Sequence, residues 1–309
     1  KVSKCWNPRC ERTLPAASGT LDMSQEDKAR ALVEKAEKKL ASWSLFGGGS
    51  KYEDAAEMYT KAANLFKVSK CWNDAGACFE KTAQCALKSD SPHEAATAHT
   101  DAANCYKKTD AKAAIEQYKE AIGIHIDLGR FPTAAKLQKE IAELHEGEGN
   151  LPLAMEAFQT AADYYQGEEN TAQGNQCLLR VAGLASAAGD YQRAIDIYEQ
   201  VGTAALESNL LKWSVKDYWL KAGICHLATG DGGAAASAVR RYNTMDASFE
   251  KTREGMLLEN LTKAFGDADA DAFTEHIRAY DEISRLSPEM TTLLLEVKNT
   301  IKAQVNDIT

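Results

Sequence analysis

The sequence lacks the features that mark membrane-spanning and nucleic-acid-binding proteins. No run of eighteen apolar residues occurs in its 309 residues, so no segment has the length of a transmembrane helix, and no secretory signal stands at its start. Its formal net charge is −9 and its isoelectric point is near 5.3. Nucleic-acid-binding proteins usually carry a concentrated basic stripe, and this sequence has none. We therefore expect a cytoplasmic protein that does not bind nucleic acid.

Proline and paired cysteines are scarce. The six prolines stand mostly where helices should begin or loops should run. None of the eight cysteines forms a C-x-x-C pair, and most lie within helical patterns, which predicts buried free thiols in a reducing compartment. The alternative is a metal or redox site on Cys71, Cys78 and Cys85, which are spaced by seven.

Catalytic motifs are absent as well. The stretch GGGSK at 47–51 lacks the spacing of a phosphate-binding loop and the strand before it, and neither G-x-S-x-G nor H-E-x-x-H occurs. The six histidines are scattered, and the patterns around His99 and His226 predict packing or surface positions. We therefore expect that the protein is not an enzyme and that it holds no cofactor and no metal.

The chain does contain a repeat with a period of about twenty residues. A small residue, a large residue four places on, and another small residue four places later recur at intervals of nineteen to twenty-one. The series includes Ala55/Tyr59/Ala63, Ala75/Phe79/Ala83, Ala134/Gln138/Ala142, Ala154/Phe158/Ala162, Ala194/Tyr198/Gly202 and Val215/Trp219/Gly223. This spacing places all three residues on one helical face, so each unit is one helix and two units form a hairpin.

These hairpins predict an all-α fold, a solenoid of the tetratricopeptide-repeat type. Turns are expected at 89–92, 107–112, 128–132, 147–152, 187–191 and 229–233, where glycine, aspartate and asparagine gather. The longer stretch QGEENTAQG, at 166–174, indicates a local change in the stacking. Ser24 is the expected cap of the first helix, which should run to about residue 40.

Three segments divide the chain. KVSKCWN occurs at 1–7 and again at 67–73, and only the second copy has a helical context. We expect 1–22 to be a non-native leader or a disordered extension, with the real chain beginning at Met23. The repeat predicts a solenoid over 23–243 and a compact helical bundle over 244–309.

An apolar loop interrupts the first hairpin at 43–51. It is rich in glycine but carries Trp43, Leu45 and Phe46, flanked by lysines. Loops are normally polar, so these side chains either fold back as a cap on the hairpin or touch a membrane surface or a partner. The residues alone leave both open.

The C-terminal segment is helical and acidic. Helices are expected at 250–265, 268–285 and 288–304. Their predicted core comprises Leu257, Leu258, Leu261, Phe265, Phe273, Ile277, Tyr280, Ile283, Leu293, Leu294, Val297 and Ile301. From residue 243 on there are thirteen acidic and seven basic residues, so most of the net charge lies at this end, which favours a basic partner there.

Several stretches resemble one family closely. ADYYQGEEN, YQRAIDIYEQVG and LLKWSVKDYWLKAGICH, in this order, are similar to the soluble NSF attachment proteins (SNAPs) of the alpha/beta type, and the resemblance runs from Met23 to Thr309. It implies a twisted sheet of helical hairpins that ends in a helical bundle. It also implies an adaptor that binds the four-helix bundle of syntaxin-type SNAREs and recruits the N-ethylmaleimide-sensitive factor (NSF), a hexameric AAA+ ATPase. NSF then disassembles the bundle in membrane fusion, intracellular protein transport and ER–Golgi transport.

The resemblance also implies binding residues. The SNARE-binding positions of the family match Arg130, Lys136, Arg180, Leu210, Trp213, Lys216 and Arg253. A curved face with spaced basic side chains suits the acidic outer surface of the bundle. One position departs from the family, because Gln176 stands where the family has lysine.

For the ATPase contact, the acidic positions of the family match more loosely. The candidates are Asp231, Glu254, Asp267, Asp269, Asp271, Asp307 and Ile308. Lys263 replaces an acidic residue of the family, and Ile308 replaces its penultimate leucine.

The apolar loop also has a counterpart in the family, which implies that Trp43, Leu45 and Phe46 give weak, peripheral attachment to cytosolic membrane faces. A generic helical-repeat scaffold for other protein partners is the alternative. It would not require the acidic C-terminal end.

Overall fold

The computed structural model describes residues 23–42 and 49–308, and this part of the chain is all-α, as the repeat predicts. Fourteen α-helices and two short 3-10 helices, η1 and η2, make up the described residues, without a strand. The elements are α1 (Gln25–Ala41), α2 (Gly49–Val68), α3 (Trp72–Lys88), α4 (Pro92–Tyr106), α5 (Ala111–Asp127), α6 (Phe131–Gly147), α7 (Leu151–Gly167), α8 (Thr171–Ala187), α9 (Tyr191–Leu206), η1 (Lys212–Ser214), α10 (Val215–Ala228), α11 (Gly232–Met245), η2 (Phe249–Lys251), α12 (Arg253–Gly266), α13 (Ala270–Asp281) and α14 (Pro288–Ile308).

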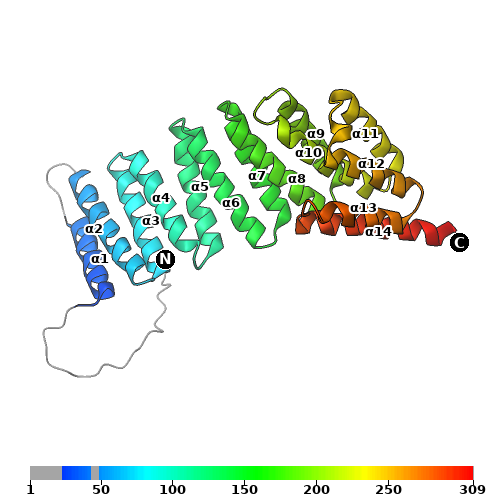
Figure 1. The fold of residues 1–309 in the computed structure, drawn as a ribbon. Helices are drawn as coiled ribbons and strands as arrows, with labels where there is room; N and C mark the ends of the chain where they lie inside the picture. The colour runs from blue at the N-terminus through cyan, green and yellow to red at the C-terminus, as the bar shows by residue number, and fades with distance from the viewer. Residues whose placement is uncertain (1–22, 43–48, 309) are drawn as a thin grey trace, which may run out of the picture.

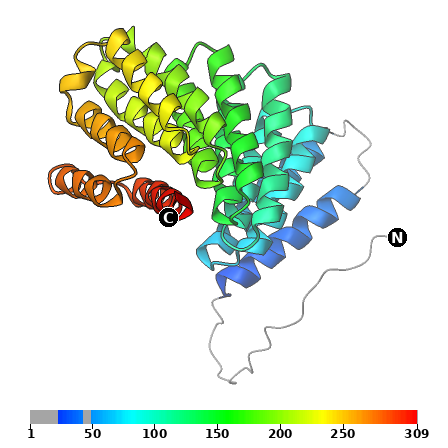
Figure 2. The same cartoon turned by 90° about the vertical axis from the view of Figure 1, so that its right-hand side faces the viewer.

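Helices α1 to α12 stand side by side as a sheet of antiparallel hairpins (Figure 1). Each helix packs chiefly against the helix before it and the helix after it in the chain. The helix axes rotate steadily along the array, so that the first and last hairpins point in different directions (Figure 2). This is the twisted solenoid that the sequence predicts.

The repeated triplets form the contacts between the helices. Their large residues are buried almost completely at Tyr59, Phe79, Tyr118, Phe158, Leu178, Tyr198 and Trp219. Gln138 is the exception, since it lies half-buried on α6. The small third residue matters where helices approach closely, as at Gly223 of α10: a Cβ there would lie 2.3 Å from a methyl carbon of Leu258 on α12.

Eight of the described turns between consecutive helices share one conformation. Each is three residues long, and the middle residue has a positive φ. Glycine holds this position at Gly129, Gly149, Gly189 and Gly230, and other residues hold it at Lys70, Asp90, Glu169 and Ala268. The stretch 166–174 contains the same three-residue turn, between α7 and α8, so the expected change in stacking is wrong. In this turn Glu169 adopts the left-handed conformation that glycine adopts in the neighbouring turns.

Substituting glycine for Glu169 should stabilise the fold. The side chain now sits at a φ of 57°, where an L-residue is strained, and glycine relieves that strain. We expect Glu169→Gly to raise the free energy of unfolding by about 0.5–1 kcal/mol in urea titrations. The matched control is Gly189→Ala in the next turn, which should lower it by a similar amount. An unchanged or lower free energy of unfolding in Glu169→Gly, or an unchanged one in Gly189→Ala, would contradict this account.

The C-terminal helices share the core of the solenoid. One continuous apolar cluster runs from Ala103 to Ile301, while two smaller clusters lie under α1 to α4. The apolar packing therefore changes near α4. The division of the chain at residue 243 stays a prediction. Nine of the twelve predicted core residues are buried. Ile283 was expected inside but is 66% exposed, because α13 ends at Asp281 rather than at 285.

The last helix lies across the array instead of extending it (Figures 1 and 2). α14 packs on α10 and also touches α8. Tyr191 of α9 donates a hydrogen bond to the Glu296 carboxylate of α14 over 2.8 Å. Beneath it, Leu294, Val297 and Ile301 are buried in the shared core. α14 thus joins three helices of the solenoid.

Local expectations are confirmed at the first helix and at the cysteines. Ser24 caps α1, because its Oγ accepts a hydrogen bond from the Asp27 amide at 3.1 Å. The cysteines in the described residues are free thiols, and all except the half-buried Cys71 are buried. Burial raises the pKa of Cys78 to about 12, so this thiol is unreactive.

Some predicted features lie outside the described residues. These are the segment 1–22 and the loop residues Trp43, Leu45 and Phe46. α14 extends to Ile308, but the side chains from residue 305 on, including that of Asp307, are not described. Across 23–42 and 49–308, no helix is long and apolar enough to cross a bilayer.

Candidate functional site

Hollows open between alternate helices of the array. One, of about 380 Å³, lies between α4 and α6, with Tyr118 of α5 in its lining. The next, of about 500 Å³, lies between α6 and α8 and is lined by Phe158 of α7. A third, of about 520 Å³, lies between α10 and α12 and is called the terminal cavity below. The surface formed by α4, α6, α8, α10 and α12 is called the even face.

Six of the seven predicted SNARE-binding residues line these hollows. Arg130 and Lys136 line the first and Arg180 lines the second. Trp213, Lys216 and Arg253 line the terminal cavity. The helical repeat explains this grouping, because alternate helices are equivalent by position and direction. The structure therefore brings residues that are spread over more than 120 positions of the sequence together on the even face.

The hollow between α4 and α6 is lined by two cations, Arg130 and Lys136, and by the carboxylates of Asp101 and Glu140. Arg130 and Lys136 have no carboxylate within ion-pair distance among the described residues, whereas Glu140 is paired with Lys107 at 2.6 Å. Burial, followed by the positive charges of Arg130 and His93, lowers the pKa of His125. The imidazole is therefore neutral near pH 7, and the positive charge of this hollow comes from its arginine and lysine.

In the hollow between α6 and α8 the charge is partly neutralised. Arg180 forms an ion pair with Glu146 of α6. Gln176 lines the same hollow, so the missing lysine of the family would have pointed here. Lys139, on the opposite wall, was not predicted from the sequence, although it follows Lys136 by one helical turn.

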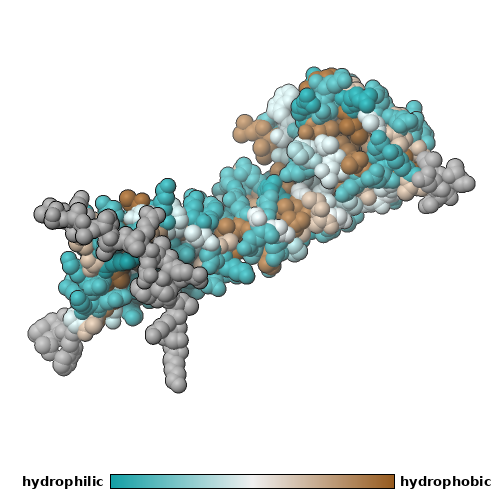
Figure 3. All heavy atoms as spheres, turned by 90° about the horizontal axis from the view of Figure 1, so that it is seen from below, coloured by the Kyte–Doolittle hydropathy of each residue, from teal (hydrophilic) through white to brown (hydrophobic). Residues whose placement is uncertain are grey.

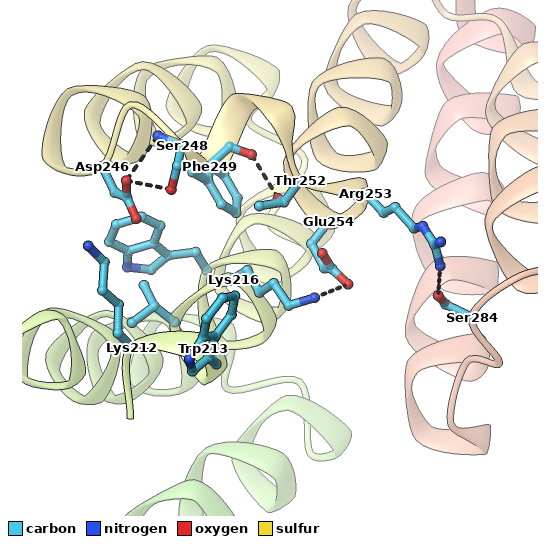
Figure 4. Close-up of a pocket in the computed structure, with 12 residues that line it drawn as sticks. Lys212, Trp213, Lys216, Asp246, Ser248, Phe249, Thr252, Arg253, Glu254 and Ser284 are labelled. Atoms are coloured by element: carbon cyan, nitrogen blue, oxygen red, sulfur yellow. Dashed lines mark hydrogen bonds and ion pairs between the residues drawn. The ribbon is translucent and has the colours of Figure 1, made fainter. Parts of the chain in front are cut away.

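The terminal cavity is lined by η1, α10, the connector that contains η2, the start of α12 and the stretch after α13. The connector between α9 and α10 supplies Trp213, which is 82% exposed at the rim (Figure 4). Leu210, from the same connector, is 89% exposed but does not line the cavity. Trp219 and Phe249 form the floor, with ring centroids 5.2 Å apart and the planes at right angles. Apolar side chains gather over this end of the molecule (Figure 3).

Two residues assigned to different partners meet in this cavity. Lys216 Nζ lies 3.1 Å from Oε1 of Glu254, and Tyr280 donates to the same oxygen at 3.2 Å. Glu254 is only 5% exposed, so it lines the cavity and is not available to a large partner at the acidic end. Arg253 donates to Ser284 Oγ at 3.4 Å (Figure 4).

The other acidic candidates gather at the far end of α12. Asp267, Asp269 and Asp271 surround the turn between α12 and α13. Asp231 begins α11 nearby, since the next residue, Gly232, faces Phe265 near the end of α12. Asp231 and Asp269 also cap helices, by accepting hydrogen bonds from backbone amides. α12 separates this cluster from Glu254 by ~20 Å.

Several lining residues were missed from sequence. Lys212 lies between two residues that were chosen, and Phe249 follows the point where the repeat fails. A periodic pattern could not find Phe249, because it belongs to the 3-10 helix η2. Within the described residues, no group of three or more histidine, cysteine or acidic side chains is placed to hold a metal.

A polar cluster supports the cavity floor from behind. Tyr242 stacks on Trp219 at 5.0 Å and donates to Glu199 at 2.6 Å, and His226 and Arg241 also contact that carboxylate. Burial raises the pKa of Glu199, but the hydrogen bonds from His226 and Tyr242 and the charge of Arg241 outweigh it, so the net shift is downward.

This cluster predicts a pH-dependent stability. A carboxyl whose pKa is lowered on folding stabilises the protein above its unfolded-state value, and that contribution is lost as pH falls through the folded-state pKa. Glu199→Gln should therefore unfold at lower urea concentration than the parent at pH 7. The difference should shrink as pH falls below about 4.5, the ordinary value for this group. A difference that is constant from pH 7 to pH 3 would contradict the assignment.

Comparisons with known proteins cover the whole of this region. The profile of the family described as soluble NSF attachment protein, SNAP, matches residues 27–302. The alpha-soluble NSF attachment protein of Vitis vinifera is 48% identical over 271 residues, which is 88% of this chain and 93% of the relative. The Homo sapiens protein of the same name is 44% identical over 290 residues, 92% of this chain and 98% of the relative. A probable vesicular-fusion protein sec17 homolog of Schizosaccharomyces pombe is 36% identical and covers 90% of this chain and 98% of the relative.

Proposed function

The chain belongs to the soluble NSF attachment protein family, and on this premise we propose how its surfaces divide the work of an adaptor. It is not an enzyme: it is an adaptor of vesicle fusion that binds assembled SNARE complexes and recruits NSF. A generic scaffold for other partners is not favoured, since the family match covers nearly the entire chain.

The even face is the surface that we assign to the SNARE bundle, of the syntaxin type. The observation that carries this proposal is the placement of Arg130, Lys136 and Arg180 along successive hollows. Cations spaced along a rigid, twisted sheet suit a coiled coil with an acidic outer surface. Leu210 and Trp213 add exposed apolar area beside the terminal cavity, where a partner can bury them.

The cluster of Asp231, Asp267, Asp269 and Asp271 is the surface that we assign to NSF, together with the end of α14 at Asp307 and Ile308. Four carboxylates around two neighbouring turns give an acidic patch for a basic partner surface. Glu254 is left out of this assignment, because it lies at the other end of α12 and is paired with Lys216.

The experiment that tests the function is SNARE disassembly by NSF, with and without this protein starting at Met23. Disassembly that depends on the protein would support the assignment of the even face to the SNARE bundle and of the acidic cluster to NSF. Binding to the bundle without disassembly would retain the even face and reject the acidic cluster as sufficient for NSF. Absence of binding to the bundle would overturn the assignment of the even face.

Membrane contact is proposed for the loop, with the protein peripheral on cytosolic faces. Trp43, Leu45 and Phe46 carry this proposal by sequence alone. Each apolar side chain that leaves water contributes roughly 1.5–3 kcal/mol, so the attachment is weak and needs several copies to act together.

Removing two of these side chains should weaken attachment. We expect Trp43→Ser with Phe46→Ser to reduce co-sedimentation with liposomes severalfold, because most of the apolar area of the loop is lost. The thermal melt by circular dichroism should be unchanged. Unchanged sedimentation, or a lowered melting temperature, would instead assign the loop to capping the first hairpin.

A further inference from the structure

The terminal cavity is large enough to hold a small molecule. Its volume of about 520 Å³ lies within the range of small-molecule sites, which are apolar hollows with a few well-placed polar groups. The floor of Trp219 and Phe249 is apolar and rigid, since both rings pack against Tyr242. Ser248, Thr252 and Ser284 add hydroxyl groups to the walls.

Two residues that line this cavity have a buried polar atom without a partner. One is Nε1 of Trp219, which lies beside Gly202 of α9, and the other is Oε2 of Glu254. Oε1 of Glu254 accepts hydrogen bonds from Lys216 and Tyr280, but Oε2 accepts none, although the residue is only 5% exposed. Buried carboxylate oxygens are nearly always hydrogen-bonded, so an orphaned one indicates a missing donor. The described residues supply no donor to this oxygen, so an occupant of the cavity that carries a donor could satisfy it.

The cavity also has unused positive charge. Arg253 donates to Ser284 and has no carboxylate within ion-pair distance among the described residues. Lys212 adds a second cation at the other end of the lining, and Lys216 is already engaged by Glu254 (Figure 4). The guanidinium of Arg253 can therefore receive a carboxylate in a bidentate manner.

We propose that the terminal cavity binds a small amphipathic acid that carries a hydrogen-bond donor, of the class of an N-acyl amino acid or the C-terminal residue of a peptide. Its carboxylate pairs with Arg253 and its apolar body covers Trp219 and Phe249, while its N–H donates to Oε2 of Glu254 once a small rotation of that carboxyl group turns the buried oxygen toward the cavity. This ligand uses the free cation, the orphaned acceptor and the apolar floor together.

The ligand would compete with the SNARE bundle. Trp213, Lys216 and Arg253 line the cavity and also belong to the proposed SNARE contact. This consequence rests on the proposed function, whereas binding of the acid to the free protein does not. The two are therefore tested separately, beginning with the free protein.

The test uses a pair of probes that differ in one group. N-decanoylglycine and N-decanoylglycinamide, both below the concentrations at which they form micelles, are titrated into the full chain and followed by calorimetry. We expect the acid to bind with one site per chain and the amide to bind at least tenfold more weakly. Acid and amide that bind alike, or an acid that does not bind, would overturn the proposal. A tripeptide, N-acetyl-Gly-Gly-Leu, and its amide distinguish a peptide terminus from a free N-acyl amino acid as the source of the carboxylate, according to which acid binds more tightly.

Variants place the site. Arg253→Gln should weaken binding of the acid at least tenfold and leave the amide unaffected, and Ser284→Trp, which adds bulk at the rim, should weaken both. Lys119→Gln, on the exposed surface of α5, removes one positive charge elsewhere and should change neither. Thermal melts establish that each variant is folded, and the Ser284 variant decides the question if Arg253→Gln is not. Full binding by the folded Arg253 or Ser284 variant would overturn the assignment.

Discussion

Reversing Lys136 and Arg180 together to glutamate will weaken binding to the SNARE four-helix bundle by about 10- to 100-fold at low salt. Both side chains lie in neighbouring hollows of the even face, so each reversal replaces attraction to an acidic coiled coil by repulsion. Arg180→Glu also places a second carboxylate beside Glu146, which adds to the negative charge of that hollow. A tenfold loss corresponds to about 1.4 kcal/mol, which two reversed charges can supply.

The control changes the same total charge elsewhere. Lys112→Glu with Lys119→Glu alters two exposed lysines of α5, which the helical spacing places away from Tyr118 and the hollow above it. This control should bind nearly as the parent does. The deficit of the first variant should shrink as salt is raised from 50 to 300 mM, because exposed charges are screened. Equal losses in both double variants would reduce the effect to net charge and contradict a specific face.

Substituting methionine for Lys216 will destabilise the protein by about 2–3 kcal/mol. The change removes the cation that faces Glu254 at 3.1 Å and leaves a carboxylate that is 5% exposed with only Tyr280 as a partner. Breaking a fully buried ion pair costs about 3–5 kcal/mol, and the partial exposure of Lys216 lowers this figure. Urea titration at pH 7 measures the loss as a lower midpoint at an unchanged slope.

Neutralising the stranded carboxylate should restore the fold. Lys216→Met with Glu254→Gln removes both charges, and we expect it to recover more than half of the lost free energy of unfolding. A double variant as unstable as the single one would show that Lys216 acts through its packing rather than through the pair. The result also bears on binding assays, since a Lys216 variant can lose affinity through instability alone.

The helices and turns of the solenoid were predictable because each repeat depends on local sequence. Small residues spaced by four place one helix against the next, and glycine or aspartate marks the turn, so both features can be read within twenty residues. The turn at Glu169 escaped this reading, because a residue other than glycine holds the left-handed position. The break that was expected there rested on composition, whereas the backbone repeats the conformation of its neighbours.

The residues that line the site were only partly predictable. The basic residues were placed by resemblance, but their pairing depends on which helices meet. Lys216 and Glu254 are 38 positions apart, and nothing in either segment indicates that they join. Ile283 looked like a core residue by spacing, and it is exposed because the helix ends two residues before it. Which of these residues pair, and which are buried, depends on how the helices pack in the folded protein.

The position of α14 has a mechanical consequence. A row of helices that touch only their neighbours bends easily, because each interface can open by a small angle without disturbing the rest. α14 spans α8 and α10 and is tied to α9 through Tyr191, so bending there would have to slide three interfaces at once. We therefore expect the C-terminal half to be stiffer than the hairpins before α8. We also expect a force applied at the end of α14 to rotate the last helices as one body before it unfolds any of them.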